Sequence, residues 1–133
     1  MTVVFEKAGY LVISYDPAKD YILFDWTSFN VTLDEIKTAH EKALEAAKRH
    51  NCRNYVADTS KVTNALGQDI IAWWGSTWVP VLAKFGLRAV ITVLPKSALA
   101  NMSTSSWQRQ VVDGIQMMNV ASRADAESAL VKV

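Results

Sequence analysis

The sequence has few of the residues and patterns that mark several common classes of protein. It contains one cysteine, Cys52, which excludes an internal disulfide and a cysteine-rich zinc site. The formal net charge is only +1, and lysine and arginine form no block that would follow a phosphate backbone. We therefore expect no binding to nucleic acid.

Long hydrophobic runs are missing as well. The longest apolar runs have the length of β-strands, well below the roughly 20 residues that span a bilayer. The first residues, MTVVFEKAGYLVISYD, lack the basic stretch and long apolar run of a signal peptide. Repeats, low-complexity tracts and linker-like segments are also missing. We expect one soluble, cytoplasmic domain spanning residues 1–133, with no membrane span.

The chain does contain enough apolar sequence for a compact fold. Half of its residues are hydrophobic and a fifth are charged, as in an ordinary globular domain. β-Branched and aromatic residues predict strands over 10–15 and 21–26, with a further short strand over 2–7. Asp16-Pro17 predicts a turn between the two stronger strands, and hence an antiparallel hairpin.

The segment TLDEIKTAHEKALEAAKRHN predicts a helix with defined ends. Thr32 and Glu35 form a capping-box pattern, in which each side chain accepts a hydrogen bond from the backbone of the other. Apolar residues then recur at helical spacing. Basic residues at 48–50 suit the negative helix end, and Asn51 suits a left-handed cap.

The rest of the chain alternates between strands and helices, which predicts an α/β fold. We expect a mixed, mostly parallel sheet with an N-terminal antiparallel hairpin and about four helices packed on it. The further expected elements are strands over 53–57, 87–94 and 114–121, a helix over 67–85 closed by Gly86, one or two short helices within 96–102 and 104–112, and a closing helix over 123–133 that Ser122 and Asp125 open.

Polar residues follow three of these strands. If strands 21–26, 53–57 and 87–94 are parallel, the loops at their carboxyl ends share one rim of the sheet, where ligands of α/β proteins usually bind. The candidate binding residues at this rim are Asp58, Thr59, Ser60, Lys96 and Ser97. The alternative is that Asp58 and Thr59 only hold a turn through hydrogen bonds to the backbone.

Four segments carry a resemblance to a known family: YDPAKDYILFDW, YVADTSKV, WW…WVPVLAKFGLRAVITVLP and ADAESAL. Their order resembles the STAS/CRAL-TRIO-like family of small bacterial proteins, which are related to the anti-anti-sigma factors of sporulation. The resemblance covers nearly the whole chain. It implies a STAS-like fold and a binding role without an agreed ligand.

The chain departs from this family at one loop. In STAS proteins the loop after the strand-ending aspartate carries a phosphorylatable serine in an Asp-Ser-Ser-Gly pattern. Here the matching loop reads Asn64-Ala65-Leu66-Gly67, so the acceptor serine is absent from its expected place. This departure leaves open whether a phosphorylation switch survives.

Sequence patterns for catalysis are weak. His40 lies on the apolar face of its helix, and no nearby pattern supplies a nucleophile or carboxylate partner, so we expect it to bond one backbone carbonyl. Cys52 has cations nearby that would favour a reactive thiolate, but a buried apolar filler is the better interpretation. The two histidines lack metal-ligand spacing. We expect no metal, no cofactor and no enzyme activity.

Three tryptophans fall within IIAWWGSTW, residues 70–78. Since a helix turns by about 100° per residue, two of them share an apolar stripe that should face the core. That stripe consists of Ile70, Trp74, Trp78, Val81 and Phe85. Trp73 lies at its edge or outside, so it is a candidate for a dimer or ligand contact, or it packs under a neighbouring loop. Pro80 predicts a kink or restart near 76–80.

Three functions follow from these observations. The first is a STAS-like regulatory module that acts through protein contacts, as a homodimer or with a partner. The second is a carrier of a small apolar or lipid-like ligand, held in a cavity lined by Trp107, Met102 and Met117 or Met118. The third is an enzyme that uses His40 or Asp58. Residues 101–107 form either a lid over the rim or a helix start with Trp107 on the sheet.

Overall fold

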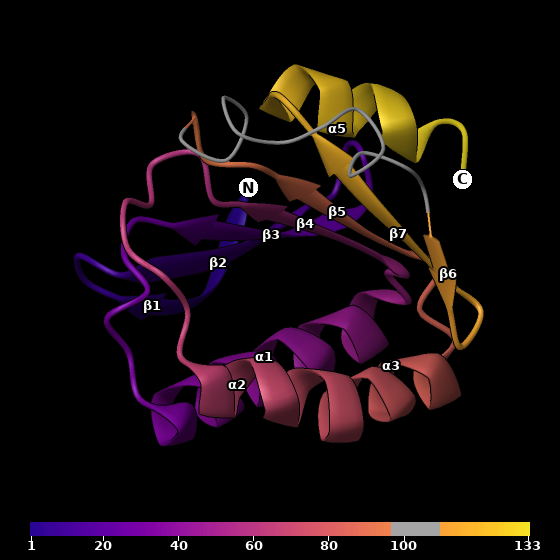
Figure 1. Cartoon of the computed structure of the whole chain (residues 1–133). Helices are drawn as coiled ribbons and strands as arrows, with labels where there is room; N and C mark the ends of the chain where they lie inside the picture. Colours follow the sequence, from indigo (N-terminus) through magenta and orange to yellow (C-terminus); the bar gives the residue numbers. More distant parts are fainter. Residues whose placement is uncertain (97–109) are drawn as a thin grey trace.

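The computed structural model describes residues 1–96 and 110–133, which form an α/β fold around one mixed, seven-stranded sheet. Its elements are β1 (Thr2–Lys7), β2 (Leu11–Asp16), β3 (Tyr21–Trp26), α1 (Leu33–His50), β4 (Asn54–Asp58), α2 (Gln68–Trp73), η1 (Trp74–Trp78), α3 (Val79–Phe85), β5 (Ala89–Val93), β6 (Gln110–Val112), β7 (Ile115–Val120) and α5 (Arg123–Leu130). The strands lie in the order β1-β2-β3-β4-β5-β7-β6. Helices α1, α2 and α3 cover one face of the sheet and α5 covers the other (Figure 1).

The first three strands form the antiparallel part of the sheet. β1 pairs with β2 and β2 pairs with β3, both antiparallel. At the β2–β3 turn, Asp16 Oδ1 accepts hydrogen bonds from the backbone N–H groups of Ala18 and Lys19, at 2.9 and 3.1 Å. Asp20 takes a left-handed φ of 56°. The predicted hairpin and its turn are confirmed.

Helix α1 has the ends that its sequence predicts. Thr32 Oγ1 accepts from the Glu35 N–H at 3.2 Å, and Glu35 Oε1 accepts from the Thr32 N–H at 2.9 Å. At the other end Asn51 takes a φ of 49° and closes the helix in the left-handed conformation. The buried face of α1 packs into the apolar cluster under the helical layer.

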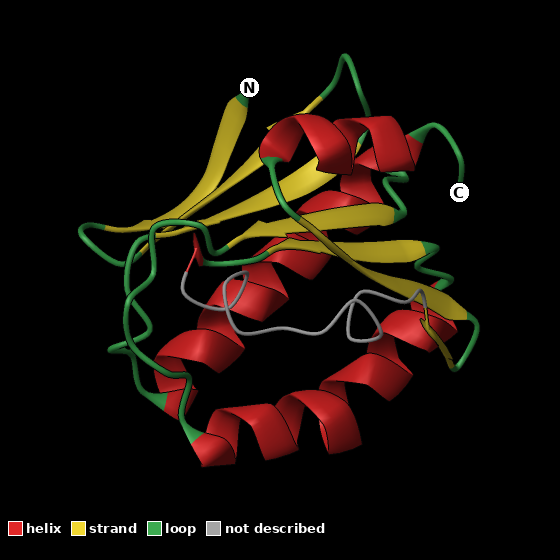
Figure 2. Cartoon of the chain, turned by 45° about the horizontal axis from the view of Figure 1, so that its top comes forward, coloured by secondary structure: helices red, strands yellow, loops and turns green. Residues whose placement is uncertain are grey.

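The sheet has two different faces because the side chains of a strand alternate. β3, β4, β5 and β7 are parallel to one another, so equivalent positions align across them. Tyr55 and Val90 belong to the cluster under α1 and α3. Val56, Ala89 and Ile91 belong to the cluster under α5. Figure 2 shows helices on both sides of the sheet.

The tryptophan helix runs from Gln68 to Phe85 and contains one π-helical turn, η1, between α2 and α3. Pro80 follows this turn. A proline has no N–H, and its ring crowds the carbonyl four residues earlier, so a wider turn accommodates it where a regular α-turn would clash. The helix therefore continues through a π turn in place of the expected kink or restart.

This π turn shifts the buried face of the helix. An extra residue in one turn rotates everything beyond it by about 100°. As a result Leu82 is fully buried and Val79 nearly so, whereas Val81 is 38% exposed. The expected stripe is therefore wrong at Val81. Ile70 and Trp78 are buried as predicted, while Trp74 and Phe85 are half-buried.

Residues 110–112 are a strand, although the sequence analysis expects a helix over 104–112. They form β6, antiparallel to β7. Asp113 and Gly114 between them take φ of 52° and 82°, the conformation of a two-residue hairpin turn. An Asp-Gly pair favours this turn, and that signal outweighs the weak helical pattern before it.

One coarser expectation about the fold needs correction, and a second, the number of helices, stays a prediction. The sheet is mixed, but only three of its six strand pairings are parallel. Within the described ranges the helices form three continuous segments, 33–50, 68–85 and 123–130, where about four helices were expected. Much of the stretch expected to supply the others, 97–109, lies outside the described residues. Ser122 does cap α5, since its Oγ accepts from the Asp125 N–H at 3.1 Å.

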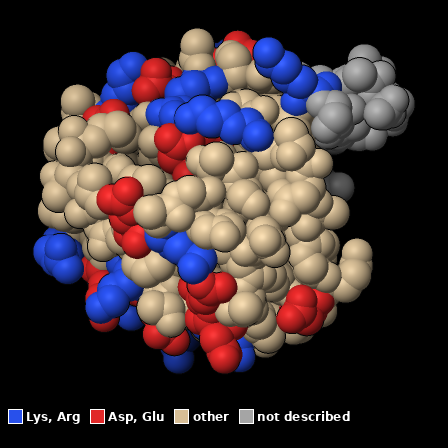
Figure 3. Space-filling model, turned by 90° about the vertical axis from the view of Figure 1, so that its left-hand side faces the viewer, with Lys and Arg blue, Asp and Glu red and all other residues tan. Residues whose placement is uncertain are grey.

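Two surface properties bear on function. Among the residues described, no helix is both long enough and apolar enough to cross a bilayer. On the face seen in Figure 3, acidic and basic side chains lie interspersed among uncharged ones.

Candidate functional site

A cavity of about 530 Å³ lies between the sheet and the helical layer. Its lining comes from β3, β4, β5 and β7 on one side and from α1, α2, η1 and α3 on the other. Cavities of roughly 300–1,000 Å³ with mainly apolar walls are typical of small-molecule sites. This cavity is therefore the candidate functional site.

The floor of the cavity consists of two aligned rows of sheet residues. Register places Phe24, Ala57, Thr92 and Asn119 in one row across the four parallel strands. The neighbouring row contributes Tyr55, Val90 and Met117. The middle of the first row is low because alanine and threonine are small. Space remains above them that larger side chains would fill.

The roof comes mainly from the tryptophan helix. Ile70, Trp74, Gly75 and Val79 line the cavity from this helix, and Trp74 and Gly75 lie in the π turn. Gly75 is exposed, and a methyl group added there would meet none of the described atoms within 4 Å. π-Helical turns often occur at functional sites. Here the π turn contributes the aromatic ring of Trp74 to the lining.

His40 of α1 supplies a buried imidazole to the lining of the cavity. It is 8% exposed, and its Nδ1 lies 3.0 Å from the Ile36 carbonyl oxygen. Because a carbonyl oxygen only accepts, Nδ1 carries the proton and Nε2 is an acceptor. Burial lowers the pKa of His40 to about 4, so the imidazole is neutral at pH 7. The predicted bond to one backbone carbonyl is confirmed.

Tyr55 supplies a second polar group to the lining. Its side chain is buried, and its hydroxyl has no hydrogen-bond partner in the described part of the chain. Burial raises the pKa of this hydroxyl, so it keeps its proton and remains a donor. A buried hydroxyl without a partner costs about 1–3 kcal/mol. A ligand atom that accepts from Tyr55 would recover part of that cost.

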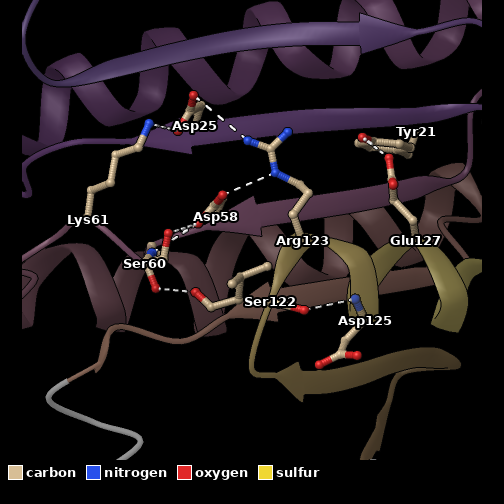
Figure 4. A network of polar contacts seen from close by, with 11 residues as sticks. Tyr21, Asp25, Asp58, Ser60, Lys61, Ser122, Arg123, Asp125 and Glu127 are labelled. Atoms are coloured by element: carbon tan, nitrogen blue, oxygen red, sulfur yellow. Dashed lines mark hydrogen bonds and ion pairs between the residues drawn. The ribbon is translucent and has the colours of Figure 1, made fainter.

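The other face of the sheet carries a polar network that joins β3 and β4 to α5 (Figure 4). Asp58 Oδ2 accepts from Arg123 Nε at 3.1 Å. Asp58 Oδ1 accepts from the backbone N–H and the Oγ of Ser60, at 3.0 and 2.6 Å. Asp25 lies 3.6 Å from Lys61 Nζ and 4.0 Å from Arg123 Nη2.

The network also determines the ionisation of Asp58. Burial by itself would raise the pKa of this carboxyl, but the hydrogen bonds from Ser60 and Arg123 outweigh burial and lower the pKa below its ordinary value. Asp58 is therefore an ionised carboxylate whose bonds are made within the protein. This agrees with the alternative that Asp58 holds a turn.

Strand alternation divides the residues that the sequence analysis places at one rim. β3, β4 and β5 are parallel, as expected. However, Thr59 lines the cavity, with its Oγ1 donating to the Val93 carbonyl at 2.6 Å, whereas Asp58 and Ser60 belong to the network toward α5. Lys96 is exposed just after β5. A ligand-binding role for this set stays a prediction.

Several predicted residues fall outside the description. Ser97, Met102 and Trp107, and with them the possible lid over 101–107, lie outside the described residues. Met117 and Met118 both line the cavity, in agreement with the expected carrier site. In the loop that replaces the STAS phosphorylation motif, Leu66 lines the cavity.

Trp73 and Cys52 have packing roles. The Trp73 ring is half-buried and stacks on Trp78, with ring centroids 5.4 Å apart and an interplanar angle of 22°. It also meets His40 edge-on at 5.6 Å. Its role at an interface stays a prediction. Cys52 is fully buried, and burial raises the pKa of its thiol to about 11, so it is an apolar filler as expected.

Sequence reasoning missed much of the cavity lining. Tyr55, Thr92 and Trp74 all line it, and none was a candidate binding residue. Side-chain alternation along YVAD and AVITV predicts which residues share a face of the sheet, so this pattern could have identified Tyr55 and Thr92. The half-buried position of Trp74 depends on the π turn and had no comparable signal.

Comparison with protein-family models, curated proteins and solved structures finds no match to this chain. In the part of the chain that the structure describes, no group of three or more histidine, cysteine, aspartate or glutamate side chains is placed to hold a metal ion. The cavity is therefore the feature of the described structure that bears most directly on function.

Proposed function

We propose that this protein binds a small apolar ligand in the cavity between its sheet and its helical layer. The observation that carries the proposal is a cavity of about 530 Å³ whose described walls are mostly aromatic and aliphatic. The interior of a well-packed domain has few voids larger than a water molecule. Apolar walls that face water cost free energy relative to walls covered by a ligand, so a bound apolar ligand would stabilise the protein.

The chemistry of the walls supports the same proposal. Trp26, Phe29 and Leu66 contribute apolar surface, and Trp26 meets Phe29 edge-on at 5.0 Å. A few polar groups, His40 and Tyr55 among them, interrupt this surface. Ligand pockets commonly combine an apolar wall with a small number of placed polar groups that orient the ligand.

Binding is a better proposal than catalysis. His40 is neutral, and its Nδ1–H donates a hydrogen bond to a backbone carbonyl. Asp58 is paired with Arg123 on the opposite face of the sheet. The two groups that an enzyme would use are therefore separated by the sheet.

The STAS-like resemblance forms part of the proposal. An antiparallel hairpin that leads into parallel strands, with helices on both faces, supports it. The regulatory module acting through a homodimer or partner is the competing function. We rank it second because Trp73, its candidate contact, already stacks on Trp78 within the molecule.

The test is binding of N-phenyl-1-naphthylamine, an uncharged apolar dye that fluoresces strongly in apolar surroundings. We expect the wild-type protein to enhance its fluorescence with saturation at one dye per chain. Ala57→Phe places a ring above the low centre of the cavity floor and should weaken dye binding at least tenfold. Thr92→Leu, from the next strand, should weaken it in the same direction.

Ala72→Phe is the matched control. Ala72 is exposed on α2 and does not line the cavity, so the same change there should leave dye binding as in the wild type. Far-ultraviolet circular dichroism confirms that each variant is folded. A wild type that does not bind the dye, or folded cavity variants that bind as well as Ala72→Phe, would refute the proposal.

A further inference from the structure

The walls of the cavity combine apolar surface with polar groups that carry no charge. None of the described lining residues is an aspartate, glutamate, lysine or arginine. The polar members are His40, Tyr55, Thr59, Thr92 and Asn119. By contrast, charged side chains form the network on the other face of the sheet (Figure 4). Among the described residues, the charged side chains thus lie away from this cavity.

Two of the polar groups are complementary and belong to rings that contact the same phenylalanine. The ring of Phe24 contacts both Tyr55 and His40, with centroid distances of 5.2 and 5.3 Å. Tyr55 offers a hydroxyl without a partner in the described chain. His40 offers Nε2 as an acceptor, because its Nδ1 proton goes to Ile36. A donor and an acceptor therefore lie around one aromatic ring.

We infer that the ligand of this cavity is a neutral amphiphile, with an apolar body and an uncharged head such as a hydroxyl group. This inference rests on the proposed binding function and names the class of ligand. A hydroxyl group can accept a hydrogen bond from Tyr55 and can donate one to His40 Nε2, so it suits either partner. An apolar body then contacts the aromatic and aliphatic walls.

An ionised head is disfavoured by the same surroundings. Moving a carboxylate or ammonium from water into an apolar cavity costs far more free energy than one hydrogen bond returns, unless a counter-ion is present. His40 does not act as that counter-ion for a carboxylate at pH 7, because burial lowers its pKa to about 4. For an ammonium, the aromatic rings offer only a cation–π contact, so an amine is the competing ligand to test.

The experiment is competition against bound N-phenyl-1-naphthylamine at pH 7.5 by three ligands of equal chain length. They are 1-octanol, octanoate and octylamine, which have eight carbons each and whose heads are neutral, anionic and cationic at this pH. We expect 1-octanol to displace the dye at a concentration at least tenfold below that needed for the other two. Equal or better displacement by octanoate or octylamine, or failure of 1-octanol to displace the dye, would overturn the inference.

Tyr55→Phe tests the assigned hydrogen bond. The variant removes one hydroxyl and keeps the ring, so 1-octanol should compete about three- to tenfold more weakly once the Kd of the dye for the variant itself is taken into account. Unchanged competition by 1-octanol would count against the role of Tyr55. The two proposals fail differently: loss of dye binding to the wild type refutes the binding function, whereas dye binding without a preference for the alcohol refutes only the ligand class.

Discussion

The two faces of the sheet use the same strands and yet end in opposite states, one filled and one hollow. On the α5 face, Val56 and Ile91 are fully buried in a packed cluster. Their chain neighbours Ala57 and Thr92 point to the other face, where the cavity lies. At these positions the α5 face has the larger side chains and the cavity face the smaller ones. The choice of residues at the centre of one face therefore contributes to the cavity.

The faces differ in polarity as well. The α5 face is tied by charged pairs around Asp58 and Arg123, which anchor the helix to the ends of the strands. The helix-covered face keeps uncharged polar groups in its cavity lining. Charge on the first face fixes a short helix, whereas the described lining of the cavity on the second face carries no charge and suits apolar molecules. The predictions below test this division.

The largest expected effect concerns the packed part of the helix-covered face. Leu82 is fully buried beyond the π turn, so Leu82→Ala should lower the free energy of unfolding by about 3 kcal/mol in urea denaturation. The adjacent change Val81→Ala should cost less than about 1 kcal/mol, because Val81 is 38% exposed. Equal losses of unfolding free energy at the two positions would mean that the π turn does not rotate the buried face of the helix as described.

The parts of the fold that can be predicted from sequence are those that depend on residues close together in the chain. The capping box at Thr32, the turn at Asp16 and the cap at Ser122 depend on neighbouring residues, and all three are confirmed. The predicted helical stripe is wrong at Val81 because a π turn shifts the helical period. Pro80 predicts that the helix is irregular near this point, but it does not predict that the irregularity is a π turn. The hairpin at Asp113-Gly114 had a local signal that was overlooked.

The next effect is a pH dependence that comes from the helix-covered face. The pKa of His40 is 6.5 in an unfolded chain and about 4 in the folded protein. Between these values the unfolded chain binds a proton that the folded protein does not, so stability is fully present above pH 6.5 and falls as the pH is lowered toward 4. The expected loss is about 3 kcal/mol, measured by urea denaturation at a series of pH values.

His40→Gln should flatten this profile between pH 6.5 and 4. His50→Gln is the control for loss of an imidazole, because His50 is exposed and stacks on Tyr15. A His40→Gln profile as steep as that of the wild type would show that other groups cause the loss.

A smaller effect is expected from the charged network on the α5 face. Arg123→Ala leaves the Asp58 carboxylate buried with only Ser60 as its partner, and should cost about 2 kcal/mol, since Arg123 itself is partly exposed. Lys61→Ala should cost less than about 0.5 kcal/mol, because that lysine is largely exposed. Dye binding should be unchanged in both variants. A similar cost for the two, or weaker dye binding, would contradict the separation of the faces.

The candidate site is less predictable than the fold. Alternation along β4 separates Asp58 and Ser60 from Thr59, so the division of the expected rim was implicit in the sequence. The cavity itself was not, because it depends on register between β4, β5 and β7 and on space above small side chains. A sequence shows which atoms are present. A void is defined by distances between residues far apart in the chain.

The smallest effect comes from the most direct comparison of the two faces, the same substitution at an alanine on each. Ala89 is fully buried under α5, so Ala89→Val should overpack that cluster and cost about 1–2 kcal/mol. Ala57 lies at the low centre of the cavity floor, so Ala57→Val adds methyl groups to open space and should change stability by less than about 0.5 kcal/mol. Both alanines lie in central strands, and valine suits a strand at either position, so the difference between the two costs reports the space above each residue. Urea denaturation measures both. If Ala57→Val is as costly as Ala89→Val, the cavity is already filled, and the proposed binding site has no room for a ligand.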